Sequence, residues 1–205
     1  MLFRARRARA LQEELAKKVV AEDCFEEAET VGGLDVSYKK GIGCAVLSVL
    51  KDGEPVKFLY TISKVPIPYV PGFLAFREVP LYIPLLKEEK PSVVLVDGHG
   101  IAHPRGLGVA SHVGVVTGVP TIGVAKKRLV GEEGSCEYGK CLFKDGKVIA
   151  AILERGKRRI YVSVGHCVSL RTAVEIVKTL WKSRLPEPIR LSDSLSRRLI
   201  RQWSP

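Results

Sequence analysis

The sequence has no apolar run that approaches the ~20 residues needed to cross a membrane, so we expect neither a transmembrane segment nor a membrane partner. Its first ten residues are rich in arginine and poor in apolar side chains, unlike a secretory signal. Internal repeats and low-complexity tracts are also absent. With 205 residues, 46% of them hydrophobic, and no obvious seam, the chain is expected to form one packed domain over residues 1–205.

Acidic residues are scarce relative to basic ones. The 33 lysines and arginines outnumber the 22 aspartates and glutamates, which gives a formal net charge of +11 and a pI near 9.6. Such a balance favours a polyanionic partner, with nucleic acid as the first candidate. The alternative is a basic soluble protein without such a partner.

Cysteine is sparse, and the five cysteines are odd in number and scattered along the chain. Several lie inside apolar runs, so we interpret them as reduced, mostly buried thiols of a cytoplasmic protein. They are Cys24, Cys44, Cys136, Cys141 and Cys167.

The first candidate site follows a short apolar run, Val93–Val96, which is too short for a helix and predicts a central parallel strand. Asp97 ends this strand, and Gly98 follows it. Ligands of open α/β sheets bind beyond the carboxyl ends of the strands, so Asp97 is a candidate functional carboxylate. The alternative is a turn in which the carboxylate caps backbone amides.

Two common kinds of site are not indicated in this stretch. The glycines after Asp97 lack the spacing of a dinucleotide-binding loop, and Pro104 interrupts them. His99 and His103 are four residues apart, but no cysteine or helical zinc motif accompanies them. We therefore expect no zinc site here.

A second acid, Asp35, lies inside the predicted strand 30–38, where apolar residues are expected. A buried carboxylate needs a cation, hydrogen-bond donors or a metal.

The chain order predicts an α/β fold with a mixed five-stranded sheet, in which the first three strands are antiparallel and the fourth and fifth parallel. Helices flank this sheet, and extra strands and helices follow at the C-terminal end. Asp35 and Asp97 are then neighbours, which favours a divalent cation between them.

The remaining elements are predicted from hydrophobic periodicity and turn residues. Glu78 lies early in the helix that starts at Phe73, where it can reach the same cation; the alternative is a capping or surface glutamate. Lys126 follows the fifth strand and either faces the site or belongs to a solvated basic turn. Asp193 lies in the last helix. Other strands are expected at 41–50, 55–63, 120–125, 140–143, 148–154 and 160–164. Helices are expected at 3–22, 107–117, 170–182 and 189–203. A kink or restart is expected at Pro80, and a polar connection at 132–139.

The segment 65–72 contains three prolines, which hold it extended and rigid. Tyr69 is placed at the tip of this loop, where a stiffly held ring can enter a base stack. The alternative is a proline-rich loop whose tyrosine packs on the core.

Five motifs in this order make the chain resemble the endonuclease V family over nearly its whole length. The motifs are G-G-L-D-V-S-Y around Asp35, P-Y-V-P-G-F-L-A-F-R-E from Pro68, V-D-G-H-G-I-A-H-P-R from Val96, P-T-I-G-V-A-K-K-R-L from Pro120 and L-P-E-P-I-R from Leu185. The resemblance implies a ribonuclease H-like fold. It also implies Mg²⁺-dependent hydrolysis, with Mn²⁺ as a substitute, of the second phosphodiester bond 3′ to inosine, which would initiate DNA repair.

The resemblance also implies roles for individual residues. Asp35, Glu78 and Asp97 would hold the metal, with Asp193 near it, and His103 and Lys126 would assist at the phosphate. Tyr69 would fill the gap left by the displaced base, while backbone groups at Gly72 and Gly98 could meet the hypoxanthine edge. Inosine-containing DNA, single- or double-stranded, is the expected substrate, with RNA as an alternative, and the chain is expected to be a monomer.

The sequence departs from the family pattern at three places. Val70 replaces the usual isoleucine of the proline-rich motif, and Gly106 stands where a second basic residue is common. The connection at residues 131–147 looks short, which puts substrate contacts there in doubt. Two other classes stay open: a different ribonuclease H-like nuclease, which shares the acids but does not need the proline-rich loop, and a non-catalytic nucleic-acid-binding module.

Overall fold

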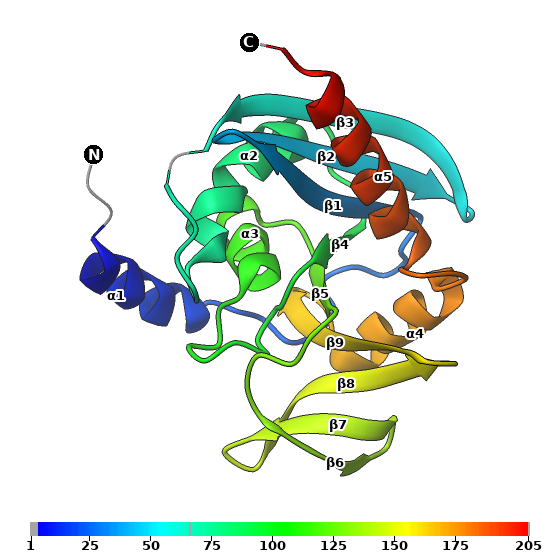
Figure 1. Ribbon diagram of the computed structural model, residues 1–205. Coiled ribbons are helices and arrows are strands. Elements are labelled where there is room, and N and C mark those ends of the chain that lie inside the picture. Colours follow the sequence, from blue (N-terminus) through cyan, green and yellow to red (C-terminus); the bar gives the residue numbers. More distant parts are fainter. Residues whose placement is uncertain (1–3, 66, 205) are drawn as a thin grey trace.

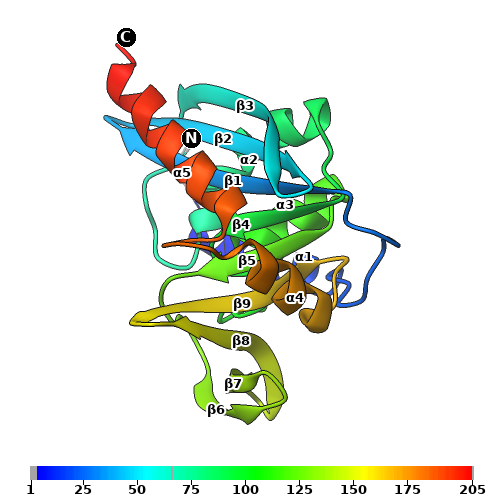
Figure 2. The same ribbon diagram turned by 90° about the vertical axis from the view of Figure 1, so that its right-hand side faces the viewer.

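The computed structural model describes residues 4–65 and 67–204 and shows one continuous nine-stranded sheet between two layers of helices (Figure 1). The strand order is β3-β2-β1-β4-β5-β9-β8-β7-β6. Figure 2 shows α4 and α5 on one face of the sheet and α1, α2 and α3 behind it.

The first five strands have the predicted arrangement. β1 (Thr30–Lys39), β2 (Ile42–Lys51) and β3 (Glu54–Lys64) form an antiparallel meander, and Asp52 and Gly53 take the positive φ angles of 54° and 81° that a tight hairpin requires. β4 (Val93–Asp97) pairs parallel to β1, and β5 (Thr121–Ala125) pairs parallel to β4. The α/β class predicted from the chain order is confirmed.

Four further strands extend the same sheet beyond β5, all of them antiparallel. They are β6 (Glu132–Cys136), β7 (Gly139–Lys144), β8 (Lys147–Arg155) and β9 (Arg158–His166). The prediction of a polar connection at 132–139 was wrong, because those residues form β6 and its turn into β7. β6 is an exposed edge strand without apolar alternation, so only its backbone pairing with β7 defines it.

The described residues form five helices: α1 (Ala5–Ala16), α2 (Leu74–Glu88), α3 (Val109–Thr117), α4 (Leu170–Leu180) and α5 (Glu187–Gln202). The last four pack on the sheet, and α1 packs against α3. α1 is shorter than the predicted 3–22, and residue 3 lies outside the described residues. The predicted restart at Pro80 was wrong, because α2 continues through both Pro80 and Pro84, and the alternative of a kink there stays a prediction. Both prolines lie on the exposed face of α2, where water can satisfy the carbonyl groups that they leave without a donor.

The hydrophobic core has one layer on each face of the sheet, because alternate strand residues point to opposite faces. Leu34, Val94 and Val96 pack with α2 and α3, whereas Val93 and Leu95 pack with α4 and the start of α5. No helix in the described part of the chain is long and apolar enough to span a membrane.

A glycine allows α5 to approach β1 closely. A Cβ atom on Gly33 would lie 2.2 Å from the carbonyl carbon of Pro188, so only glycine fits against the first turn of α5. Hydrogen bonds fix the contact: Ser192 Oγ donates to Gly33 O at 2.7 Å, and Ser48 Oγ donates to Pro188 O at 2.8 Å. This contact places the middle of α5 beside the end of β1.

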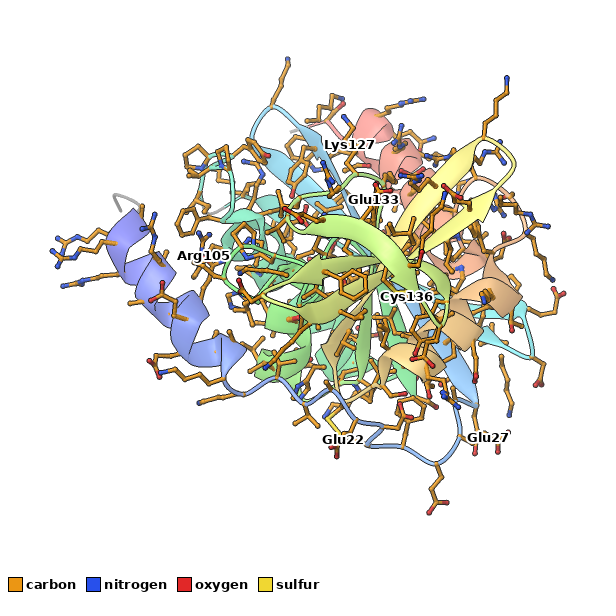
Figure 3. The ribbon with its side chains drawn as sticks, turned by 90° about the horizontal axis from the view of Figure 1, so that it is seen from below. Glu22, Glu27, Arg105, Lys127, Glu133 and Cys136 are labelled. Atoms are coloured by element: carbon orange, nitrogen blue, oxygen red, sulfur yellow. A yellow bond between two sulfur atoms is a disulfide. The ribbon has the colours of Figure 1, made fainter. Side chains whose placement is uncertain are left out.

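The prediction of reduced cysteines was wrong for four of the five. Cys24 is bonded to Cys167, and Cys136 is bonded to Cys141; Cys44 is free and buried, as predicted. The first pair is 143 residues apart in sequence, and only the fold brings its Cα atoms to 5.0 Å. The second pair bridges the β6–β7 hairpin, whose edge strand carries the labelled Cys136 in Figure 3.

Candidate active site

A polar cavity of about 520 Å³ lies where β1 and β4 end side by side. We call it the carboxylate cavity. Side chains reach it from both faces of the sheet, from α2 and from α5. It brings together five of the six predicted catalytic residues: Asp35, Glu78, Asp97, Lys126 and Asp193.

Asp35 lies in the second half of β1 and is only 7% exposed. The hydroxyl of Ser196 on α5 donates to Asp35 Oδ2 at 2.7 Å. Burial raises the pKa of Asp35 to about 7, and the charges of Asp97 and Asp193 add to the rise, against the lowering effect of the Ser196 hydrogen bond. The carboxyl group is therefore held beside other acids in a place where its negative charge is poorly solvated.

Glu78 lies in the second turn of α2 and is buried, which contradicts the alternative of a surface glutamate. Tyr38 donates its hydroxyl to Oε1 at 2.8 Å, and Tyr82 donates to Oε2 at 3.4 Å. Burial raises the pKa of Glu78 to about 8, with further contributions from the charges of Asp35 and Asp97. The two tyrosines orient the carboxyl group in the cavity.

Asp97 ends β4 and is paired with Lys126, which follows β5. Lys126 Nζ donates to Asp97 Oδ2 at 2.5 Å, and the two side chains are 42% and 16% exposed. An ion pair this exposed contributes little to the stability of the fold. Its position at the rim of the cavity points to a role in function instead. Lys126 faces the carboxylate cavity and not a solvated turn.

Asp193 is 5% exposed and comes from the middle of α5. Arg197 Nε donates to its Oδ1 at 2.8 Å, and Arg184 Nη2 donates to its Oδ2. The Asp193 carboxylate thus holds two arginines at the side of the cavity that α5 forms.

The donor set suits a hard divalent cation, because Asp35, Glu78 and Asp97 offer carboxylate oxygens whose crowding such a cation would relieve. Within residues 4–65 and 67–204, however, no three His, Cys, Asp or Glu side chains lie close enough together to hold a metal as they stand. Asp97 is engaged by Lys126. These side chains fit the ion by chemical type, and they would have to draw together to hold it.

A second, more apolar cavity of about 200 Å³ opens beside the first, and we call it the base cavity. It brings together four predicted residues, Tyr69, Gly72, Gly98 and His103. His103 thus lies here and not in the carboxylate cavity; burial, with the charge of Arg105, lowers its pKa to about 4. The sequence did not indicate the other lining residues, which are Gln12, Leu74, Ala75, His99, Leu107, Gly108, Val109 and Leu129.

Tyr69 is 66% exposed at the rim of the base cavity, which contradicts the alternative that its ring packs on the core. Pro66, one of the three prolines of this loop, lies outside the described residues. Gly98 also lines this cavity, and glycine is favoured there because a Cβ atom would lie 2.3 Å from Val109 Cγ1. A wedge role for Tyr69 stays a prediction.

Gln12 is a cavity residue that sequence reasoning missed. It is 1% exposed although α1 is mostly exposed, and its amide donates to Gly72 O at 3.1 Å and Leu107 O at 3.4 Å. Arg105 donates from Nε to Gln12 Oε1 at 2.7 Å, and it lies on the side of the molecule that faces α1 (Figure 3). Nothing in the helical pattern of residues 5–16 distinguishes this glutamine, since its partners come from distant loops.

Comparisons with known proteins identify the family of this chain. The family model described as Endonuclease V matches residues 13–194. A relative from Ignicoccus hospitalis, named Endonuclease V, is 58% identical over 206 residues, which cover 98% of each chain. The crystal structure of human ENDOV superposes with a TM-score of 0.86 at 36% identity, covering 97% of this chain and 99% of that one.

A third similar protein, endonuclease V of Ciona intestinalis, was solved in complex with a 24mer DNA containing an inosine followed by a ribo-adenosine. It superposes with a TM-score of 0.85 at 31% identity and covers 94% of this chain and 95% of that one. The family match spans most of the chain, and the relatives align over almost their full length. This chain therefore belongs to the endonuclease V family.

Proposed function

We propose that the protein is a divalent-cation-dependent endonuclease that recognises inosine in a nucleic-acid strand and hydrolyses the second phosphodiester bond on its 3′ side. One observation carries the proposal: Asp97 lines the carboxylate cavity, and the next residue, Gly98, lines the base cavity. A base held in one cavity therefore brings its own strand past the acids of the other. Inosine-containing DNA is the proposed substrate because a relative that covers most of this chain binds such DNA.

The carboxylate cavity supplies the hydrolytic groups. Asp35, Glu78 and Asp97 would hold Mg²⁺, or Mn²⁺ in its place, which when bound supplies charge neutralisation and a more acidic water. Lys126 lies at the rim, where its ammonium group neutralises negative charge that develops on the scissile phosphate. Asp193 lies on the α5 side of the same cavity and is proposed to complete the acidic set.

The base cavity supplies recognition. Inosine pairs weakly, so unstacking it costs a few kcal/mol at most. The exposed Tyr69 ring at the rim would fill the vacated place in the stack, while the backbone at Gly72 and Gly98 would meet the polar edge of hypoxanthine. His103 is neutral at pH 7 because burial lowers its pKa to about 4. Its Nδ1 accepts from the backbone N–H of Arg105, so its other ring nitrogen carries the proton and can donate a hydrogen bond.

The test is a nicking assay on matched strands that carry inosine or adenosine at one position, in DNA and in RNA, with Mg²⁺ and with chelator. We expect a metal-dependent cut at the second bond 3′ to inosine, and none with Asp97→Ala. Equal cutting of both strands would indicate a different ribonuclease H-like nuclease. Tight binding without any cutting would indicate a binding module. Cleavage of damaged DNA would place the enzyme at the start of a DNA repair reaction. We also predict that the enzyme acts as a monomer and in the cytoplasm.

A further inference from the structure

A second hollow, of about 590 Å³, adjoins the carboxylate cavity on the side of α5. It shares Asp193, Arg197 and Arg201 with that cavity and continues along the outer surface of the helix. We call it the arginine groove. Its lining residues are Arg184, Arg190, Asp193, Ser194, Arg197, Arg198, Arg201 and Gln202.

The groove has a large excess of positive charge. Five arginines line it against a single carboxylate, Asp193, and the neighbouring Glu187 pairs with Arg190. Arg184 and Arg197 share Asp193, so its one charge neutralises only part of theirs. Among the ion pairs of the described residues, none involves Arg198 or Arg201. The groove therefore presents a net charge of about +3 to solvent, which favours an anion with several charges.

The arginines are held in place and face outwards. Ile189 and Ile200 on the opposite side of α5 are buried in the core, and Asp193 fixes the guanidinium groups of Arg184 and Arg197. The side chains of Arg184 and Arg197 still keep 50% and 55% of their surface exposed, so donors remain available to a ligand. Planar guanidinium groups match phosphate oxygens in pairs, which makes phosphate the fitting anion.

The groove lies at the end of a path that begins at the base cavity. Helices α1, α2 and α3 line the base cavity from one face of the sheet, whereas α5 forms the groove on the other face (Figure 2). The carboxylate cavity takes Glu78 from the first face and Asp193 from the second, so it lies between the two. A strand with its odd base in the base cavity and its scissile bond at the acids reaches the arginine groove if it continues in the same direction.

We propose that the arginine groove binds the sugar–phosphate backbone of the substrate strand on the 3′ side of the cut. This inference rests on the proposed function, because the direction follows from a cut placed 3′ to inosine. Arg190 to Arg201 spans about 16 Å along the helix axis, equal to about five phosphates of one B-form strand. The groove therefore holds the product fragment that lies on the 3′ side of the cut.

The test varies the two flanks of an inosine-containing strand separately. Binding is measured by fluorescence anisotropy in Ca²⁺, and cleavage by single-turnover nicking in Mg²⁺. Lengthening the 3′ flank by about five nucleotides should tighten binding to the wild type about tenfold, whereas lengthening the 5′ flank should not. In the double variant Arg190→Gln/Arg198→Gln, which leaves the lining of both other cavities intact, this gain should disappear and the salt slope should fall by about 2.

The matched control is Arg171→Gln/Lys178→Gln, which removes the same charge from α4 on the same face of the sheet, and it should keep the gain. Neutral methylphosphonate linkages in the 3′ flank should abolish the gain in the wild type and change nothing in the groove variant. The proposal is overturned if the groove variant keeps the full gain in affinity from the longer 3′ flank. It is also overturned if an acidic peptide competes with the nucleic acid for binding while the length of the 3′ flank has no effect on affinity. Equal binding of inosine and adenosine strands, with the flank effect intact, would instead count against the proposed function.

Discussion

Gln12 and Arg105, which are 93 positions apart in sequence, donate hydrogen bonds to the same oxygen, the carbonyl of Gly72. They are also bonded to each other, from Arg105 Nε to Gln12 Oε1 at 2.7 Å. Gly72 has a φ of +78°, a conformation that other residues rarely adopt, and it begins the wall of the base cavity after the tyrosine loop. The position of this wall therefore depends on a helix far away in sequence.

Replacing Gln12 by glutamate should weaken inosine recognition while leaving the acids untouched. Glutamate keeps the size of the side chain and its contact with Arg105, but it cannot donate to Gly72 O. Gly72 O keeps its bond from Arg105, but the buried carbonyl of Leu107 loses its donor. We expect this to cost about 1–3 kcal/mol in the ratio of single-turnover nicking of inosine to adenosine strands. Glu14→Gln on the exposed face of α1 is the control. An unchanged ratio in Gln12→Glu would show that the wall is fixed by other contacts.

Lys126→Ala should slow the chemical step. An ammonium group that neutralises charge in the transition state contributes about 2–4 kcal/mol, so the single-turnover rate should fall between about 30-fold and about 10³-fold. The exposed neighbour Lys127 is the matched control, because Lys127→Ala removes the same charge one position farther along. If Lys126→Ala changes only affinity, Lys126 is an ordinary phosphate-binding residue.

The metal-free protein should lose stability as the pH rises. The pKa values of Asp35 and Glu78 are raised in the folded state from 3.8 and 4.5 to about 7 and about 8, so the folded state binds more protons than the unfolded chain between these values. Stability is then greatest near the unfolded values and falls as the pH passes through the folded ones. Thermal unfolding in chelator at about pH 5 and about pH 9 measures this fall.

Glu78→Gln should remove much of that fall and stabilise the metal-free protein by about 2–4 kcal/mol at high pH, with little effect at low pH. Mg²⁺ should stabilise the wild type more at high pH than at low pH, because it competes with protons for the same oxygens. Equal unfolding temperatures across the pH range would show that folding does not raise the pKa of Asp35 or of Glu78.

Tyr69→Ala should reduce discrimination between inosine-containing and undamaged duplexes. Stacking of one base on an aromatic ring contributes about 1–3 kcal/mol, so the ratio of single-turnover nicking rates should fall accordingly. Tyr69→Phe should keep most of the ratio, since stacking needs the ring and not the hydroxyl. Because the side chain is 66% exposed, neither change should affect folding. A ratio that Tyr69→Ala leaves unchanged would assign lesion recognition to other groups.

The central half of the fold was predictable because its signals are local. The buried run Val93–Val96, the Asp52-Gly53 turn and the acid inside β1 each follow from a few neighbouring residues. The parallel pairing of β1 with β4 then brings Asp35 and Asp97 to one edge, and the structure confirms that pairing.

Long-range relationships could not be predicted. Nothing near Cys24 points to Cys167, and nothing in α1 marks Gln12 as a partner of Gly72. β6 was missed for a related reason, since an edge strand in solvent needs no apolar alternation and is defined by backbone hydrogen bonds alone. The arginines of α5 acquire their arrangement only when α5 packs against Gly33.

Cys24 precedes β1 and Cys167 follows β9 in the sequence, so the disulfide bond between them spans all nine strands. The whole sheet is thus one covalent ring, from which α1 extends at one end and α4 and α5 at the other. By the chain-entropy relation, closing a ring of 143 residues restricts the unfolded chain by about 5 kcal/mol. In denaturant, a single proteolytic cut in any loop within the ring therefore leaves the chain in one covalent piece until a reductant opens the disulfide, whereas a single cut outside the ring separates a helix from the rest.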